Sequence, residues 1–165
     1  MRGKEVKKIP KFLEERSFEV ISLIEPNSIY FAHPVSVYNT HLEKVLVKRL
    51  KSFFKNKNIY NPNQPHNQKN YKIWKDGTGS GMNYYFDLIL PNKNIVGGVY
   101  LPFEDGMIGA GIYGEMEKLQ EMKKPIFEIK KLNQIEKILK IDSSRKLSIE
   151  QTRERAYKKW QTEMK

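Results

Sequence analysis

The sequence predicts an α/β domain in which helices cover both faces of a mostly parallel sheet. Short apolar runs typical of buried strands alternate along the chain with longer segments of helical periodicity. No repeat interrupts this order, and strand–helix–strand units of this kind join parallel strands by right-handed crossovers. The strand-like runs are 29–32, 58–60, 95–101, 125–129 and 138–141. The 165 residues fit a single domain, with an N-terminal extension over 1–28 and a C-terminal helical segment over 143–165.

Local signals place the helices between these strands. Thr40 and Glu43 have the spacing of a capping box, and apolar residues follow on one helical face. Ser148 and Gln151 have the same spacing and predict a final helix that runs to about Trp160. Further helices are expected over 82–90, where Pro91 stops the helix, and around 112–119, where apolar residues recur at helical spacing. Gly97 and Gly98 within a strand indicate that another part of the backbone approaches closely.

Two segments leave alternatives open. The residues before 28 fit a helix after Pro10 and a later strand equally well. The segment 61–81 is polar and rich in Asn, Pro and Gly, which predicts a long loop unless it contains a short helix. Its glycine-rich end, 76–81, lacks the lysine of a phosphate-binding loop, so we expect a flexible lid or a plain loop there.

The composition excludes several kinds of site. The chain has no cysteine, which rules out disulfides, thiolate nucleophiles and thiolate metal ligands. The three histidines are too scattered for metal-ligand spacing, so we expect no metal and no cofactor. No run approaches the roughly 18 apolar residues of a membrane span, and 1–11 lacks the apolar stretch of a secretory signal. We therefore expect a cytoplasmic protein without membrane contact.

The chain is strongly basic, with 30 Lys and Arg against 19 Asp and Glu and a formal net charge of +11. This charge either reflects a generally charged surface or raises the local concentration of a polyanion or a phosphorylated ligand. The basic residues are spread along the whole chain, with one modest concentration over 130–146, and no nucleic-acid motif accompanies them. We therefore do not expect nucleic acid as a partner.

The densest candidate site is the stretch 102–115. In parallel α/β sheets, ligands bind outside the carboxyl ends of the strands, and this stretch follows one of them. Four glycines in the nine positions from Gly106 to Gly114 indicate a close approach. Glu115 is expected at a helix start, where free N–H groups favour the ionised carboxylate. The alternative is purely structural, with Glu115 as a first-turn acid and Asp105 as a turn residue.

The end of the first strand is a second candidate. Alternation places Tyr30 and Ala32 on one face and Phe31 and His33 on the other, so these residues are not all expected to face one pocket. A lone histidine at this position is otherwise a hydrogen-bonded strand-end residue.

Taken together, the Tyr30–Pro34 segment, the 95–101 strand, Asp105, the Gly111–Glu115 element and the 124–126 strand entry resemble the nucleoside 2-deoxyribosyltransferase-like family. That family includes the deoxynucleoside monophosphate N-glycosidases, and the resemblance covers roughly 29–130. It implies a flavodoxin-like (Rossmann-like) three-layer fold with about five strands. It also implies a homo-oligomer in which a neighbouring subunit completes the pocket.

The resemblance assigns roles to individual residues. Glu115, four residues after Gly111, corresponds to the glutamate that attacks the anomeric carbon of the sugar, and Tyr30 to the tyrosine that orients it. Asp105 is our candidate for the acid or the sugar-hydroxyl partner, and Tyr38, Phe103 or Tyr113 for stacking on the base. The candidate substrate-binding residues are His33, Pro34, Ser36, Phe103, Gly109, Gly111 and Tyr113.

The sequence departs from the family pattern at two positions. Gly109 stands where the family has an aspartate, and Ile112 where it has a threonine. The leading hypothesis is an enzyme that transfers or hydrolyses the (deoxy)ribosyl group of a nucleoside or nucleotide, and the net charge would favour a phosphorylated substrate. The alternatives are an inactive nucleotide-binding module and a basic nucleic-acid-binding protein.

Overall fold

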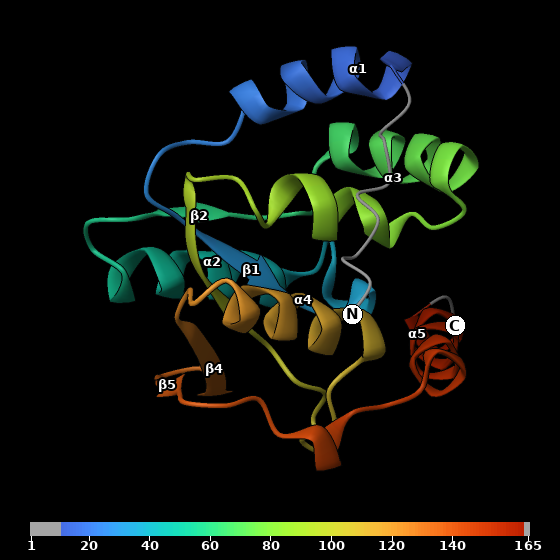
Figure 1. Cartoon of the computed structure of the whole chain (residues 1–165). Coiled ribbons are helices and arrows are strands. Elements are labelled where there is room, and N and C mark those ends of the chain that lie inside the picture. The colour runs from blue at the N-terminus through green and yellow to red at the C-terminus, as the bar shows by residue number, and fades with distance from the viewer. Residues whose placement is uncertain (1–10, 164–165) are drawn as a thin grey trace, which may run out of the picture.

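The protein is an α/β fold with a five-stranded sheet in the order β2-β1-β3-β4-β5 (Figure 1). The computed structural model describes residues 11–163. The strands are β1 (Ser28–Ala32), β2 (Asn58–Tyr60), β3 (Ile95–Tyr100), β4 (Ile126–Lys131) and β5 (Gln134–Ile138). The first four are parallel, and β5 is antiparallel to β4. This strand order and the flanking helices make a flavodoxin-like three-layer fold, as predicted.

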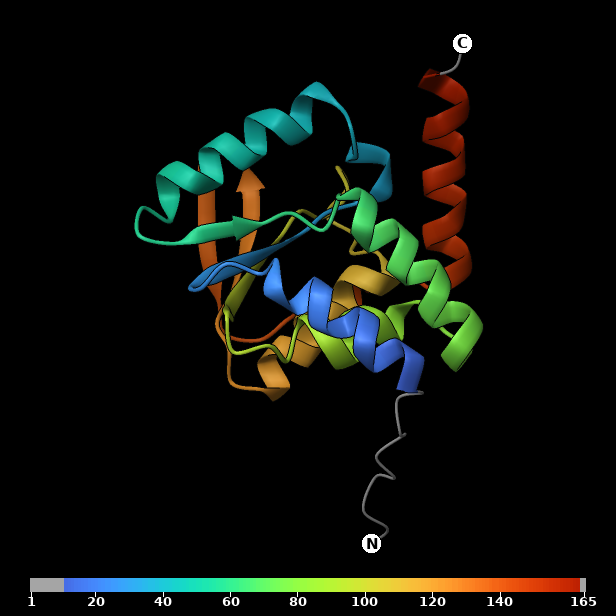
Figure 2. The same ribbon diagram turned by 90° about the horizontal axis from the view of Figure 1, so that it is seen from above.

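Helices lie on both faces of the sheet (Figure 2). The helices are α1 (Lys11–Ser22), α2 (His41–Phe53), α3 (Pro65–Thr78), α4 (Ala110–Glu121) and α5 (Ile149–Glu163), with short helical segments η1 (Val35–Val37), η2 (Tyr84–Ile89) and η3 (Ser143–Arg145). Residues of α2 and of β1, β3 and β4 form one buried cluster, whereas α1, α3, η2 and α4 share the other. The carboxyl ends of β1 and β3 open toward α5.

The predicted helix caps are confirmed. The Glu43 backbone N–H donates to Thr40 Oγ1 at 3.3 Å. At the start of α5, the Gln151 N–H donates to Ser148 Oγ at 3.0 Å, and the Gln151 side chain accepts from the Ser148 N–H at 2.9 Å. Both helix starts can be predicted from the sequence, because the side chain that accepts from the free N–H is only three residues away along the chain.

The close approach predicted at the β3 glycines is also confirmed. A Cβ atom at Gly97 would lie 2.7 Å from the Pro125 carbonyl oxygen, and one at Gly98 would lie 2.4 Å from Leu119 Cδ1. Only glycine lets α4 and the entry to β4 pack this tightly on β3.

One open alternative is decided, and two expectations are revised. The segment before residue 28 forms helix α1 where it is described, and its Leu13, Val20 and Ile24 side chains are buried in the main core. Most of 61–81, expected as a loop, is the 14-residue helix α3, which ends at Gly79 with a φ of 86°. The last strand is 134–138 rather than 138–141, because the chain turns back directly after β4 as a hairpin.

Within 11–163 no helix is long and apolar enough to cross a lipid bilayer.

Candidate functional site

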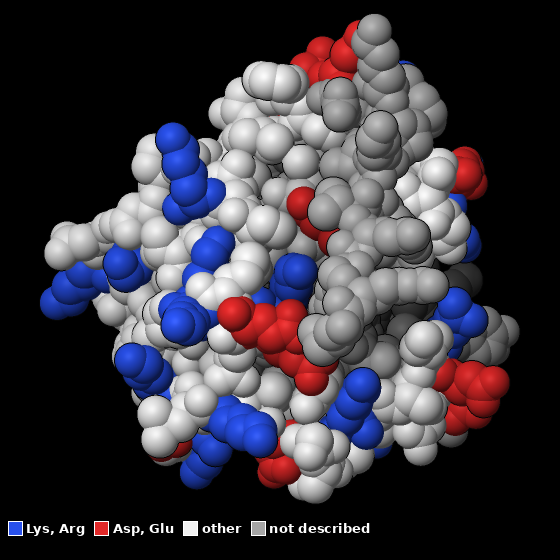
Figure 3. Space-filling model, in the orientation of Figure 1, with Lys and Arg blue, Asp and Glu red and all other residues white. Residues whose placement is uncertain are grey.

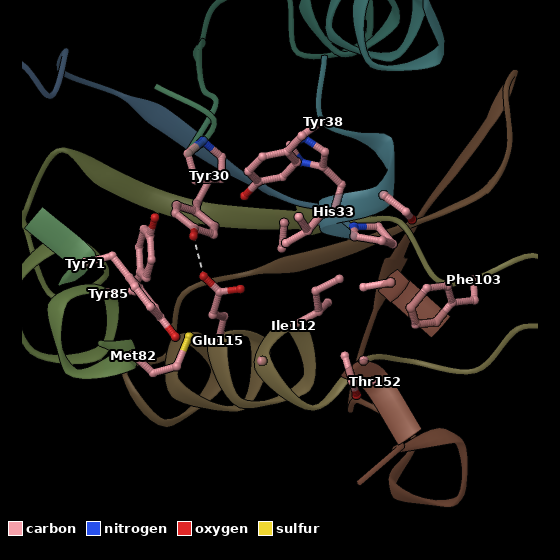
Figure 4. A pocket seen from close by; sticks show the side chains of 18 of the residues that line it. Tyr30, His33, Tyr38, Tyr71, Met82, Tyr85, Phe103, Ile112, Glu115 and Thr152 are labelled. Carbon is pink, nitrogen blue, oxygen red and sulfur yellow. Dashed lines mark hydrogen bonds between the residues drawn. The ribbon is translucent and has the colours of Figure 1, made fainter. Parts of the chain in front are cut away.

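A cavity of about 420 Å³ lies at the carboxyl ends of β1 and β3 (Figure 4). Its walls come from segments far apart in the sequence. These are β1 and the residues up to 38 that follow it, helices α3 and η2, the Phe103 loop, the first turns of α4, and one face of α5. The position agrees with the rule that parallel sheets bind ligands beyond the carboxyl ends of their strands.

Glu115 is the carboxylate among the described residues of this wall. It lies on α4, its side chain points toward β1, and only 6% of the residue is exposed (Figure 4). Burial raises the pKa of Glu115 to about 7, and the hydrogen bond from Tyr30 opposes that rise. Near neutral pH the group therefore exists in both its charged and its neutral form.

The expectation that Glu115 sits at a helix start is wrong. Helix α4 begins at Ala110, so Glu115 is the sixth helical residue and lies in the second turn. The free N–H groups of the first turn precede it, and the helix dipole is not what sets its charge. The structural alternative, a first-turn acid, is wrong for the same reason. Burial of the side chain against β1 sets the pKa of Glu115 instead.

Tyr30 occupies the predicted position beside Glu115. Its hydroxyl donates a hydrogen bond to Glu115 Oε2, across a sequence separation of 85 residues. The ring stacks on Tyr60 at a centroid distance of 5.8 Å and meets the edge of Tyr85 at 6.1 Å. Burial, followed by the Glu115 charge, raises the Tyr30 pKa well above its ordinary value, which keeps the hydroxyl a donor.

His33 lines the same cavity as Tyr30, although its ring stacks on Phe31 at a centroid distance of 4.0 Å, on the face that alternation predicts. Strand β1 ends at Ala32, and the cavity lies beyond this end, so residues of both faces reach it. The His33 Nδ1 is 3.0 Å from the Phe31 carbonyl oxygen, and its Nε2 is 2.7 Å from Glu43 Oε2. Both ring nitrogens thus face acceptors, as in a hydrogen-bonded strand-end residue.

The His33–Glu43 pair also fixes the segment that follows β1. Glu43 accepts a further hydrogen bond from the Asn39 backbone N–H at 3.2 Å and two from the Asn63 side chain at 3.0 Å. Burial raises the pKa of Glu43, but the hydrogen bonds from His33 and Asn63 outweigh it and hold that pKa below its usual value. The segment 33–39 is therefore anchored at both ends.

This anchored segment brings three of the predicted residues into the cavity. Pro34, Ser36 and Tyr38 all line it. Ser36 is 5% exposed, and its Oγ has no hydrogen-bond partner among the described residues. Buried hydroxyls are normally paired, so Ser36 Oγ is available to a ligand.

The structure does not bring Asp105 into this cavity. Its carboxylate instead receives two hydrogen bonds from the Arg155 guanidinium, at 2.8 and 2.7 Å, and lines a neighbouring groove. These hydrogen bonds lower the Asp105 pKa to about 2, so it is a permanent carboxylate rather than an acid. The groove also contains Ser36 and Phe103, which makes Phe103 a shared wall between the two hollows.

Some of the other residues predicted within 103–115 line the cavity, and others do not. Gly109 and Gly111 line the cavity, whereas Tyr113 does not. The Tyr113 ring lies under Lys146 Nζ, 4.9 Å from the ring centroid, because it projects from another side of α4. At Gly109 a Cβ atom would approach Thr152 Cγ2 to 3.2 Å, so the glycine allows α5 to pack on the α4 N-terminus.

Sequence reasoning missed several cavity residues. Tyr71 and Gln68 lie on α3, in the segment expected to be a loop, and Thr152 and Ala156 lie on α5. Tyr85 belongs to the helix expected over 82–90, and it also lines the cavity beside Met82 (Figure 4). The available signal was the recurrence of tyrosine in the 71–85 region, which a loop or core assignment does not require.

Among the described residues, the cavity wall has few charged side chains and no cluster that could bind a metal ion. No group of three His, Asp or Glu side chains in the described chain is placed to hold a metal ion. Among the described cavity residues there is no Lys or Arg. The wall is thus mainly aromatic and apolar, with one titratable carboxylate.

The sequence matches no protein-family model, and neither curated proteins nor solved structures gave a significant match.

Proposed function

We propose that this protein is an N-glycosyl enzyme that cleaves or transfers the (deoxy)ribosyl group of a nucleoside, with Glu115 as the nucleophile. The observation that carries the proposal is the buried Glu115 carboxylate, which meets the Tyr30 hydroxyl on the wall of the cavity. A volume of about 420 Å³ is within the range of small-molecule sites.

The reaction needs a carboxylate in such a setting. Breaking the bond between the anomeric carbon and the base develops positive charge on the sugar, and a carboxylate stabilises that charge or adds to it covalently. In a buried site this attraction is stronger than in water. The resulting glycosyl ester is released by water in hydrolysis or by a second base in transfer.

The surroundings of Glu115 suit this role. A pKa of about 7 gives a large ionised fraction at neutral pH and a more basic oxygen than an ordinary carboxylate has. Tyr30 orients the attacking oxygen, and Tyr38, Tyr85 and Phe103 offer aromatic faces to the base. Asp105 has no part in this proposal, because its carboxylate is bound to Arg155.

The cavity favours an unphosphorylated nucleoside, which revises the expectation drawn from net charge. None of the described cavity residues is basic, and Glu115 would repel a phosphate. On the face shown in Figure 3, Lys and Arg side chains are spread out and interspersed with acidic ones. In the described chain as a whole, Lys130 lies 3.7 Å from Glu128 and 3.9 Å from Glu136, and Arg145 and Arg155 pair with Glu128 and Asp105. This arrangement does not favour nucleic-acid binding either.

Release of free base tests the proposal. The full-length protein is incubated with deoxynucleosides, ribonucleosides and their 5′-monophosphates, and free base is quantified by chromatography. Glu115→Ala should abolish release, whereas Glu117→Ala, an exposed position on the same helix, should retain it. Unchanged release by Glu115→Ala would reject the nucleophile assignment. Ligand binding without any release would instead support the inactive binding module.

The predicted homo-oligomer stays a prediction. Light scattering of the purified protein tests it directly.

A further inference from the structure

The cavity carries a charge opposite to that of the chain as a whole. The chain has a formal net charge of +11, yet Glu115 is the single carboxylate of the described cavity wall and no described Lys or Arg accompanies it. His33 adds no positive charge at neutral pH, because burial lowers its pKa below the ordinary value of 6.5. With Glu115 ionised, the cavity is therefore anionic.

Tyrosine rings surround this carboxylate. Tyr30, Tyr38, Tyr71 and Tyr85 line the cavity, and Figure 4 shows their rings gathered over and beside Glu115. The Tyr71 and Tyr85 rings lie 6.3 Å apart. Burial is the main cause that raises the pKa values of Tyr38 and Tyr85, and the Glu115 charge adds to it at both. Aromatic faces around an anion form a site that attracts a cation.

The cavity also lacks a group that can protonate a leaving base. Asp105 is turned away and bound to Arg155, and both ring nitrogens of His33 are engaged. Tyrosine hydroxyls are weak acids, and burial weakens those of Tyr38 and Tyr85 further. Glu115 cannot serve as this acid while it acts as the nucleophile. The described residues therefore supply a nucleophile without a general acid.

A neutral base that departs without a proton leaves as an anion, which the Glu115 cavity disfavours. A base that already carries a positive ring nitrogen leaves as a neutral molecule and needs no acid. We propose that the substrate is an N-glycoside of a cationic heteroaromatic base, such as a pyridinium riboside. The cationic ring lies among the tyrosines and its sugar lies against Glu115. This inference rests on the proposed function.

The step balances without a co-reactant other than water. A Glu115 carboxylate oxygen bonds to the anomeric carbon while the carbon–nitrogen bond breaks. The electron pair of that bond returns to the ring nitrogen and cancels its charge, and no proton moves. Water then attacks the anomeric carbon, the ester bond to Glu115 breaks, and the water proton passes to solvent.

Binding tests the preference for a cation. Calorimetry at pH 8, where Glu115 is mainly ionised, compares nicotinamide riboside with benzamide riboside, a neutral carbon-linked analogue of nearly the same shape. The wild-type protein should bind the cation at least tenfold more tightly. Glu115→Gln should reduce that difference below threefold, and Glu117→Gln should leave it unchanged. Equal or tighter binding of the neutral analogue overturns the inference.

Turnover separates this inference from the proposed function. A general acid usually contributes about 10²–10⁴-fold, so without one kcat/KM for nicotinamide riboside or its 2′-deoxy analogue should exceed that for neutral nucleosides by at least about 100-fold. Values within tenfold of each other overturn the inference and leave the proposed function intact. Cation-selective binding with no cleavage of any N-glycoside overturns both the enzyme assignment and the substrate proposal.

Discussion

Replacing Tyr30 by Phe tests the pairing on which the site depends. The substitution keeps the ring that stacks on Tyr60 and removes only the hydroxyl that donates to Glu115. A hydrogen bond to a charged group contributes about 1.5–3 kcal/mol, and one pKa unit corresponds to about 1.4 kcal/mol. The Glu115 pKa should therefore rise by about 1–2 units from its value of about 7.

This rise has a consequence for activity at pH 7. The ionised fraction of Glu115 should fall from about one half to between about one tenth and one hundredth. Because the charged form is the nucleophile, the acidic limb of the kcat/KM profile should move to higher pH by the same 1–2 units. At pH 10 the variant should recover most of the wild-type rate.

The measurement does not depend on knowing the substrate. A carbon-13 NMR titration of glutamate side chains follows the Glu115 carboxyl in wild type and in Tyr30→Phe, with Glu115→Gln to assign the signal. A wild-type midpoint near 4.5, or a midpoint that Tyr30→Phe leaves unchanged, would refute the reasoning.

Three further predictions concern stability and binding. The Glu115 pKa of about 7 lies above the ordinary 4.5, so the folded state gains stability that is full below about pH 4.5 and is lost as pH rises through 7. Glu115→Gln removes this loss. In denaturant titrations, the unfolding free energy of Glu115→Gln minus that of wild type should therefore rise by about 3 kcal/mol between pH 4 and pH 8.5. A difference that stays constant over this range would contradict the prediction. Asp105→Ala breaks the largely exposed pair with Arg155, so unfolding should change by less than about 1 kcal/mol and base release by less than about threefold; a tenfold loss of release would place Asp105 in the chemistry. Ser36→Ala should leave the free protein as stable or more stable, because Oγ has no partner, and should weaken nucleoside binding by about 2–10-fold in calorimetry; unchanged affinity would mean that the hydroxyl does not contact the ligand.

Much of the fold could be predicted because its signals are local. The strands near 29–32, 58–60, 95–101 and 125–129 are short apolar runs. The starts of α2 and α5 are set by side chains that accept from an N–H three residues further along the chain. Helix α3 was missed because it lacks a clear apolar stripe. Its buried residues are Asn67, Asn70 and Trp74, and Asn67 accepts hydrogen bonds from the Tyr60 and Tyr84 hydroxyls. Those partners lie outside the helix, so its own sequence does not reveal them.

The candidate site was predictable only in part. The resemblance paired Tyr30 with Glu115, and the structure brings them together. The sequence offers Asp105 as the acid or the sugar-hydroxyl partner, but Arg155, 50 residues away, binds its carboxylate outside the cavity. For Tyr71 and Tyr85 the sequence offers only the recurrence of tyrosine in the 71–85 region, which does not say which rings line the cavity.

The sequence by itself determined the alternation of strands and helices, the helix caps and the presence of an acid after a glycine-rich turn. Periodicity and capping involve residues at most a few positions apart, so a linear pattern records them. Only the tertiary structure decided that Glu115 is buried beneath tyrosines while Asp105 is exposed and paired. Desolvation and long-range hydrogen bonds set those charges, and both arise when segments such as β1, α4 and α5 pack together.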